Sequence, residues 1–372
     1  MVIELLNDKN FPALRRFTEQ VWDRPDCEDY YRWRYTEAPG LVTVVAMEDD
    51  QCIATISAFS KPYFNGTEML ECLEPFDWHA HPSKKGSGAG LRVMKYLMRA
   101  GKPIVGFGGT PDALNVLPLL GFKQICEAAY YVLPLTTRYL LRNRKLPAQV
   151  KHLATPAMDA AASLWFRPGK PGRRSKETLL PVSGINRDLT HISGPGGFRS
   201  APDAGFYRWL MTGFTDAGTY LPFVLAIDGE AVAWALGRLH RVEGLLHGTF
   251  IDIRLRGDDE QLALSIIGRM ASAMAGFGVD QVNATSASPL LGAAFRNSGF
   301  RTGREKIPGF VWPGTHKLKT DVVALNMLHG DGAFIAMPNR SQHQRLCHSP
   351  VTRQAAFQPE AHGITGLRAA GA

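Results

Sequence analysis

The feature that most constrains the fold of this chain is an internal repeat. Tyr31–Trp33 (YRW) recurs 176 residues later as Tyr207–Trp209. Thr110–Phe122 recurs 178 residues later as Ser288–Phe300, with Pro in second place and Gly-Phe at the end of both segments. Two matching spacings in the same order indicate two copies of one supersecondary unit within the 372 residues.

The residues between these markers predict the same order of elements in both halves. A hairpin around an acidic turn comes first, then a long strand, an amphipathic helix, a buried strand, and a short helix that begins at Ser or Thr and ends at Gly. The expected elements of the first half are Val42–Met47, Cys52–Phe59, Met69–Ala80, a helix with Leu91, Met94, Leu97 and Met98 on one face, Ile104–Phe107, and a helix from Thr110 to Gly121. Those of the second half are Phe223–Ile227, Ala231–Leu239, Leu245–Ile253, a helix with Leu262, Ile266, Ile267 and Met270 on one face, Gln281–Thr285, and a helix from Ser288 to Gly299.

Composition narrows the class of protein. Hydrophobic residues make up 45% and charged residues 20%, as in globular proteins, and no apolar stretch is long enough to span a bilayer. The start of the chain lacks a secretory signal, and five cysteines without metal-site spacing indicate reduced thiols, so we expect a cytoplasmic protein without a metal site. The net charge of +8 favours an anionic partner, but the sequence has no basic-aromatic runs of a nucleic-acid module.

A shift in composition separates the two halves. Residues 136–177 are basic and hold four prolines, which predicts a linker with one helix around Gln149–Phe166. The predicted domains are therefore 1–135 and 178–337, joined by this linker and followed by a polar tail at 338–372. Trp33 and Trp209 are expected in the core rather than in a ligand site.

The clearest chemical signal is His81–Gly90 (HPSKKGSGAG), between a predicted strand and an amphipathic helix. Glycines at such a junction let the backbone approach a ligand, and the helix start adds positive potential. Lys84 and Lys85 add further positive charge. This combination suits a pyrophosphate, although a glycine-rich turn alone fits several nucleotide folds and plain turns.

With its surroundings, this segment resembles the acetyl-CoA motif of the GNAT acetyltransferase superfamily (Arg/Gln-x-x-Gly-x-Gly/Ala). The similarity is good over Val2–Leu135 and only general over Leu179–Gly314, and Lys85 stands where that family has Arg or Gln. The resemblance implies an α/β (α+β) fold of two tandem GNAT-like domains, each with a mixed, mostly antiparallel sheet flanked by helices. It also implies acetyl-CoA as co-substrate, bound by Ala80, Lys84, Lys85, Gly86, Ser87, Gly88, Ala89 and Gly90.

The second half lacks this glycine-rich segment. Arg254–Glu260 (RLRGDDE) occupies the corresponding place. Asp258, Asp259 and Glu260 would stabilise the start of the following helix but repel a pyrophosphate. We therefore expect one acyl-CoA site per chain, in the first half.

GNAT enzymes, as the resemblance implies, catalyse direct attack of an amine on the thioester. Glu74 stands at the place of a catalytic glutamate in one branch of the family, and Asp77 is a second candidate base. Weaker candidates are Glu71, His79 and His81. The family's usual Tyr, which protonates the leaving thiolate, is replaced by Leu117 in the first half and Phe295 in the second. Tyr96, Tyr130 or Tyr131 could serve instead, or water could, or catalysis could have been lost.

The expected function is N-acetyl transfer from acetyl-CoA to the amine of a small molecule or an amino sugar. One alternative is a related tandem fold that transfers an amino acid from aminoacyl-tRNA. Another is a non-catalytic binding or scaffold protein. The sequence leaves open the acceptor, the acyl group and the oligomeric state.

Overall fold

The structure is a computed structural model that describes residues 1–22, 28–84, 86–137, 177–194, 196–215, 218–242, 244–329 and 352–353. The helix expected at 149–166 and Lys85 lie outside the described residues, as does the tail apart from Thr352 and Arg353. Within the described ranges, no helix has the length and apolar character that crossing a bilayer requires.

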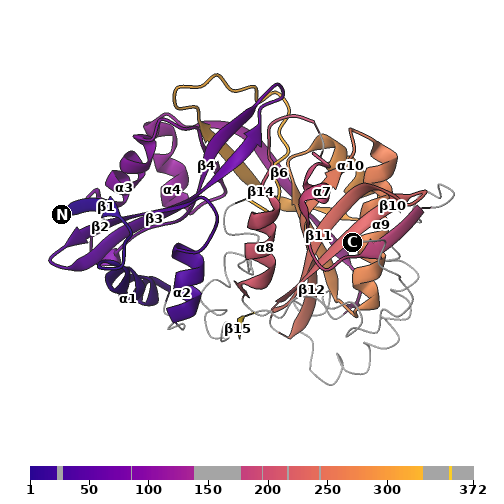
Figure 1. Ribbon diagram of the computed structural model, residues 1–372, viewed down its shortest axis with the longest axis horizontal. Coiled ribbons are helices and arrows are strands. Elements are labelled where there is room, and N and C mark those ends of the chain that lie inside the picture. Colours follow the sequence, from indigo (N-terminus) through magenta and orange to yellow (C-terminus); the bar gives the residue numbers. More distant parts are fainter. Residues whose placement is uncertain are drawn as a thin grey trace.

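The two halves of the chain form their elements in a similar order (Figure 1). The first half comprises β1 (Val2–Leu5), α1 (Phe11–Trp22), α2 (Glu28–Tyr35), β2 (Leu41–Glu48), β3 (Gln51–Phe64), β4 (Met69–Ala80), the 3₁₀ helix η1 (Pro82–Lys84), α3 (Ala89–Met98), β5 (Ile104–Phe107), α4 (Pro111–Val116), the 3₁₀ helix η2 (Pro118–Leu120) and β6 (Lys123–Pro134). The second comprises β7 (Glu177–Pro181), α7 (Arg187–Thr190), β8 (Arg199–Ser200), α8 (Ala204–Thr212), β9 (Phe214–Thr215), β10 (Gly218–Ile227), β11 (Glu230–Val242), β12 (Leu245–Leu255), α9 (Glu260–Gly276), β13 (Gln281–Ser286), α10 (Pro289–Asn297) and β14 (Arg301–Trp312), while β15 (Thr352–Arg353) pairs with β9.

The local signals in the sequence act as predicted. Asp49 and Asp50 turn the first hairpin with φ of 50° and 61°, and Asp228 with φ 50° begins the corresponding turn of the second. The Thr110 hydroxyl accepts the amide of Ala113 at the start of α4, as Ser288 does for α10.

The strands form one mixed, mostly antiparallel sheet flanked by helices, which confirms the predicted class of fold. Its order is β1-β2-β3-β4-β5-β14-β6-β13-β12-β11-β10-β7, with β8 beside β3. Only β4–β5 and β12–β13 pair in parallel among the described strands. One cluster of buried residues lies under α3 and another under α9 and α10, while α1, α2 and α8 contribute to a third.

The last strand of each half completes the sheet of the other half. β14 lies between β5 and β6 and pairs with both, and β6 pairs in turn with β13. Figure 1 shows β6 and β14 beside each other between the two halves. β6 and β14 run antiparallel beside each other, so an approximate two-fold axis passes between them. Because the sheet is continuous across this exchange, the predicted division into two domains stays a prediction.

The repeated YRW segment meets its own copy near this axis. The Trp33 and Trp209 rings stack with centroids 4.8 Å apart. Each indole N–H donates to the main-chain oxygen of the other residue, at 3.3 Å from Trp33 and 3.2 Å from Trp209. Both side chains are buried, which confirms that they belong to the core, and the repeat therefore marks the contact between α2 and α8.

Gly213, directly after α8, leaves the space that the Trp33 indole fills. Its φ of −87° suits any residue, but an added Cβ would overlap the indole ring. Gly213→Ala should therefore lower the free energy of unfolding by about 1–3 kcal/mol. Gly276→Ala is the matched control, because no atom lies within 4 Å of a Cβ added there. Urea unfolding measures both, and equal effects would contradict the assigned contact.

Candidate functional site

The glycine-rich segment forms an open turn between β4 and α3. Gly86 and Gly88 adopt φ of 85° and 76°, a region that side chains with a Cβ enter only at a cost. A Cβ added to either residue would meet no atom within 4 Å. The positive φ therefore requires these two glycines, packing does not, and the open space leaves their backbone bare.

The first turn of α3 is fixed against β4. The indole N–H of Trp78 donates to the Gly90 carbonyl at 2.7 Å, and a Cβ on Gly90 would lie 3.6 Å from that of Ala80. The first amides of a helix have no intrahelical acceptor, and together with the helix dipole they attract an anion. β4 thus holds a positively polarised helix start beside the glycine turn.

Lys84 is tied to the rim of this turn. Its ammonium group pairs with Glu48 at the end of β2, and this hydrogen bond lowers the pKa of the Glu48 carboxyl. Part of the Lys84 charge is therefore already offset within the protein. Lys85, the residue that departs from the family motif, lies outside the described residues. Binding of acyl-CoA by the predicted residues Ala80 to Gly90 stays a prediction. The backbone conformation of Gly86 and Gly88 supports it, whereas the ion pair of Lys84 with Glu48 does not.

β4 and β5 separate next to the glycine turn. In the described residues they share one paired position, Leu73 opposite Ile104, and the Leu73 amide donates to the Pro103 carbonyl at 2.8 Å. β4 then continues to Ala80 with an irregularity at Asp77, whose φ is 48°. The strand edges beyond Leu73 are therefore parted, with the start of α3 on one side of the sheet and Glu74 on the other.

Glu74 is the first β4 residue beyond this paired position, and it is fully buried. Its Oε1 accepts from the Lys61 ammonium at 2.9 Å and its Oε2 accepts from the Tyr63 hydroxyl at 2.6 Å. Burial alone would raise the pKa of the Glu74 carboxyl, but the charge on Lys61 and these hydrogen bonds hold it below its ordinary value. Glu74 is therefore ionised at neutral pH, with both oxygens engaged inside the protein.

Asp77 fastens α2 to β4. The Arg34 guanidinium donates two hydrogen bonds to its carboxylate, at 2.7 and 2.8 Å, and the Tyr35 hydroxyl donates a third at 2.8 Å. Burial acts to raise the pKa of Asp77, but the Arg34 charge and these hydrogen bonds keep it below its ordinary value. Such a carboxylate is a weak proton acceptor. Its catalytic role stays a prediction, whereas its hold on α2 is visible.

The other candidates for a catalytic acid or base lie apart from one another. Glu71 is exposed and pairs with Lys102 at 2.9 Å, while His81 contacts the Ser83 hydroxyl at 2.7 Å. Tyr131 packs in the second half, stacked on Phe295 with ring centroids 5.1 Å apart. The structure therefore does not bring Tyr131 to the glycine turn.

The corresponding loop of the second half contacts its own chain. The Asp258 carboxylate accepts the Gly196 amide at 2.6 Å, and Asp259 caps α9 by accepting the amides of Gln261 and Leu262. A carboxylate and a chain segment thus lie where the first half offers glycines and an open helix start. The expected repulsion of a second pyrophosphate stays a prediction.

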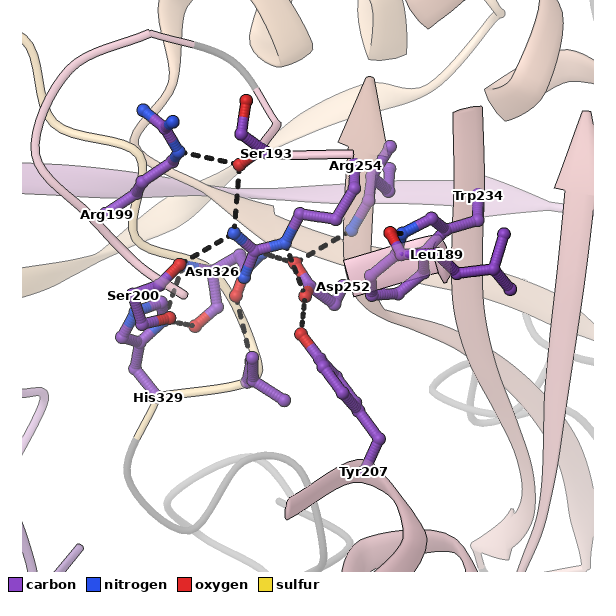
Figure 2. Close-up of polar contacts among 12 residues, drawn as sticks. Leu189, Ser193, Arg199, Ser200, Tyr207, Trp234, Asp252, Arg254, Asn326 and His329 are labelled. Carbon is purple, nitrogen blue, oxygen red and sulfur yellow. Dashed lines mark hydrogen bonds and ion pairs between the residues drawn. The ribbon is translucent and has the colours of Figure 1, made fainter. Parts of the chain in front are cut away.

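A buried polar network lies within the second half (Figure 2). Asp252 on β12 accepts from Tyr207, Arg254 and Asn326 at 2.7, 2.8 and 2.8 Å. Figure 2 also shows His329, whose Nδ1 contacts the main chain of Asn326. No sequence pattern points to His329, because a single histidine after an apolar segment belongs to no motif.

The environment of Glu74 predicts a measurable cost for its loss. Glu74→Gln would leave the Lys61 ammonium buried without a carboxylate, which should lower the free energy of unfolding at pH 7 by about 3–5 kcal/mol. Glu71→Gln, on the same strand, should cost less than about 1 kcal/mol, because its pair with Lys102 is exposed. Urea unfolding measures both variants.

This difference should depend on pH in one direction. The folded protein holds the pKa of the Glu74 carboxyl below the value it has in the unfolded chain. Glu74 therefore adds to the free energy of unfolding at pH values above its pKa in the unfolded chain. This contribution is lost as the pH falls through its pKa in the folded protein. The gap between wild type and Glu74→Gln should therefore shrink below about pH 4. A gap that does not change with pH would contradict an ionised Glu74.

No protein-family model and no curated protein matches this sequence. Solved structures do match. A GCN5-related N-acetyltransferase from Anabaena variabilis aligns over 84% of this chain and 73% of its own, with TM-score 0.60 and 10% identity. A probable N-acyltransferase from Enterococcus faecalis aligns over 83% and 71%, with TM-score 0.57 and 9% identity. N-myristoyltransferase from Saccharomyces cerevisiae with bound myristoyl-CoA aligns over 84% and 82%, with TM-score 0.51 and 12% identity. At these identities the likeness shows the fold, so this chain has a GNAT-like fold.

Proposed function

We propose that this protein is an acyl-CoA-dependent N-acyltransferase that moves an acyl group, most simply acetyl, to the amine of a small molecule or an amino sugar. The observation that carries the proposal is the pair of left-handed glycines, Gly86 and Gly88, beside the start of α3. Neither is required by packing, and both leave the backbone open to a pyrophosphate. The thioester of the bound donor would then lie between β4 and β5, where the two strands separate beyond Leu73.

The residues that would hold the donor act mainly through their backbone. Amides around Gly88 and in the first turn of α3 would receive the pyrophosphate, while Trp78 keeps that turn against β4. A thioester between the parted strands would meet the amine at the level of Glu74. Because both Glu74 oxygens are engaged, its part in proton transfer would act through a neighbouring group.

The solved structures of similar fold support the class of donor. Two are named as N-acetyltransferase or probable N-acyltransferase, and the third holds myristoyl-CoA. Acyl groups of very different length thus occur within this fold. The choice of acetyl here rests on the motif and is part of the proposal.

Donor binding can be tested at the glycine turn. Gly88→Glu should weaken acetyl-CoA binding at least about a hundredfold, because a side chain and a negative charge would occupy the place of the pyrophosphate. Gly66→Glu is the matched control: Gly66 also has a positive φ (96°) and open space, but it lies in the turn after β3. Calorimetric titration measures both variants. Unchanged affinity in folded Gly88→Glu would refute the assignment.

The contrast between the two loops predicts the stoichiometry. One acetyl-CoA should bind per chain, because Asp258 already accepts a main-chain amide in the second loop and would repel a pyrophosphate. Calorimetry or equilibrium dialysis with labelled acetyl-CoA gives this number directly. Two sites of similar affinity would show that the second loop rearranges to bind the donor.

A further inference from the structure

The segment after β14 returns to the centre of the molecule. Val323 bridges to Phe198, and Asn326 bridges to Ser286 at the end of β13. The Ala287 amide donates to the Leu325 carbonyl at 2.9 Å, which fixes the segment beside the second half. Its residues also pack with Tyr63 and Val105 of the first half. This path delivers His329 to the point where β4 and β5 part.

The position of His329 follows from its neighbours on three adjacent strands. Its ring centroid lies 6.0 Å from that of Tyr63 on β3 and 5.9 Å from that of Phe107 on β5. β4 lies between these strands, and Tyr63 donates to Glu74 on it. The imidazole is therefore above β4 at the level of Glu74, on the face of the sheet opposite α3.

The two ring nitrogens of His329 have different surroundings. In one tautomer Nδ1 accepts from the Asn326 amide at 3.1 Å and Nε2 carries the proton; in the other Nδ1–H donates to the Asn326 carbonyl oxygen at 3.0 Å. Nε2 is buried and has no hydrogen-bond partner among the described residues. When Nδ1–H donates to the Asn326 carbonyl, Nε2 carries a lone pair and is the nitrogen that can accept a proton. A buried nitrogen without a partner requires an explanation.

We propose that His329 Nε2 accepts the proton of the attacking amine, so that His329 is the general base of the acyl transfer. This inference rests on the proposed function, since it needs a thioester between β4 and β5. The amine nitrogen attacks the thioester carbonyl carbon and forms the C–N bond, and one N–H proton passes to Nε2. The C–S bond then breaks, and the thiolate leaves and becomes a thiol by taking a proton. The products are an amide and free coenzyme A, and the proton on His329 returns to the thiolate or to water.

The charges around His329 suit this role. Glu74 from β4 and Asp252 from β12 favour the imidazolium that forms, while Lys61 from β3 opposes it, and Tyr63 from β3 is neutral. Burial has the largest effect and, with Lys61, keeps the pKa of His329 below its ordinary value despite the two carboxylates. The imidazole is thus neutral at pH 7 and able to accept a proton. Glu74 acts through it as a positioning residue that stabilises the transient charge.

Bromoacetyl-CoA tests the position of His329 without requiring the acceptor. Its electrophilic carbon is next to the thioester carbonyl, so Nε2 should displace bromide, forming an N–C bond as the C–Br bond breaks. Mass spectrometry of the digested wild-type protein should locate the added group on His329, and excess acetyl-CoA should prevent the labelling. His240→Gln, which removes a buried histidine on β11, should be labelled like the wild type.

The outcomes separate the two proposals. Bromoacetyl-CoA that binds by calorimetry but labels His79, His81 or no residue would overturn the role of His329 and leave the proposed function standing. If it does not bind at all, the proposed function fails, and the role of His329 fails with it.

A kinetic comparison gives an independent readout. With acetyl-CoA and a panel of amines that includes glucosamine, His329→Gln should lower kcat by about 10²–10⁴-fold while the affinity for acetyl-CoA is unchanged. The wild-type rate should fall on the acidic side as His329 becomes protonated, for amines of different basicity alike, and His329→Gln should lack this limb. An unchanged rate or an unchanged acidic limb in the variant would overturn the proposal.

Discussion

The exchange of final strands between the halves is the constraint on which the rest of the structure depends. Because β14 pairs with β5 and β6 pairs with β13, neither half has a complete sheet of its own. The exchange also brings α2 and α8 together, where Trp33 and Trp209 stack and share reciprocal hydrogen bonds. It finally determines where the chain leaves β14, beside the first half, so that the following segment can pass over β4 and β5.

Buried carboxylates keep the helices in register with this sheet. Asp77 on β4 holds α2 through Arg34 and Tyr35, and Asp252 on β12 holds α8 through Tyr207. Each is a buried charge that would be costly without its partners. The two halves use the same device at corresponding strand positions but with different donors. In both halves a strand carboxylate holds a helix against the sheet, but the helix residues that donate to it differ.

The sequence predicts what is local in this fold and misses what depends on distant pairing. Turn residues such as Asp49, the Thr110 cap and the glycines of the turn before α3 act through their own backbone, so their patterns suffice. The periodicity of the sequence does not predict the exchange of β6 and β14, because either strand has an apolar pattern that could pair with β5. Glu74 shows the same limit: its strand position suggests a base, but its protonation depends on Lys61 and Tyr63 across the sheet. His329 reaches the site only because the chain returns after β14.

The difference between the two halves follows from what fills each loop before the central helix. In the first half Gly86 and Gly88 keep the backbone bare, and the start of α3 stays open to an anion. In the second half Asp258 supplies the anion from within the chain and binds the Gly196 amide. The second half is thereby stabilised without a ligand, and it provides β14 and the segment that carries His329. Under the two proposals, donor binding and proton transfer would come from different halves of one continuous sheet, with the glycine turn in the first half and His329 in the second.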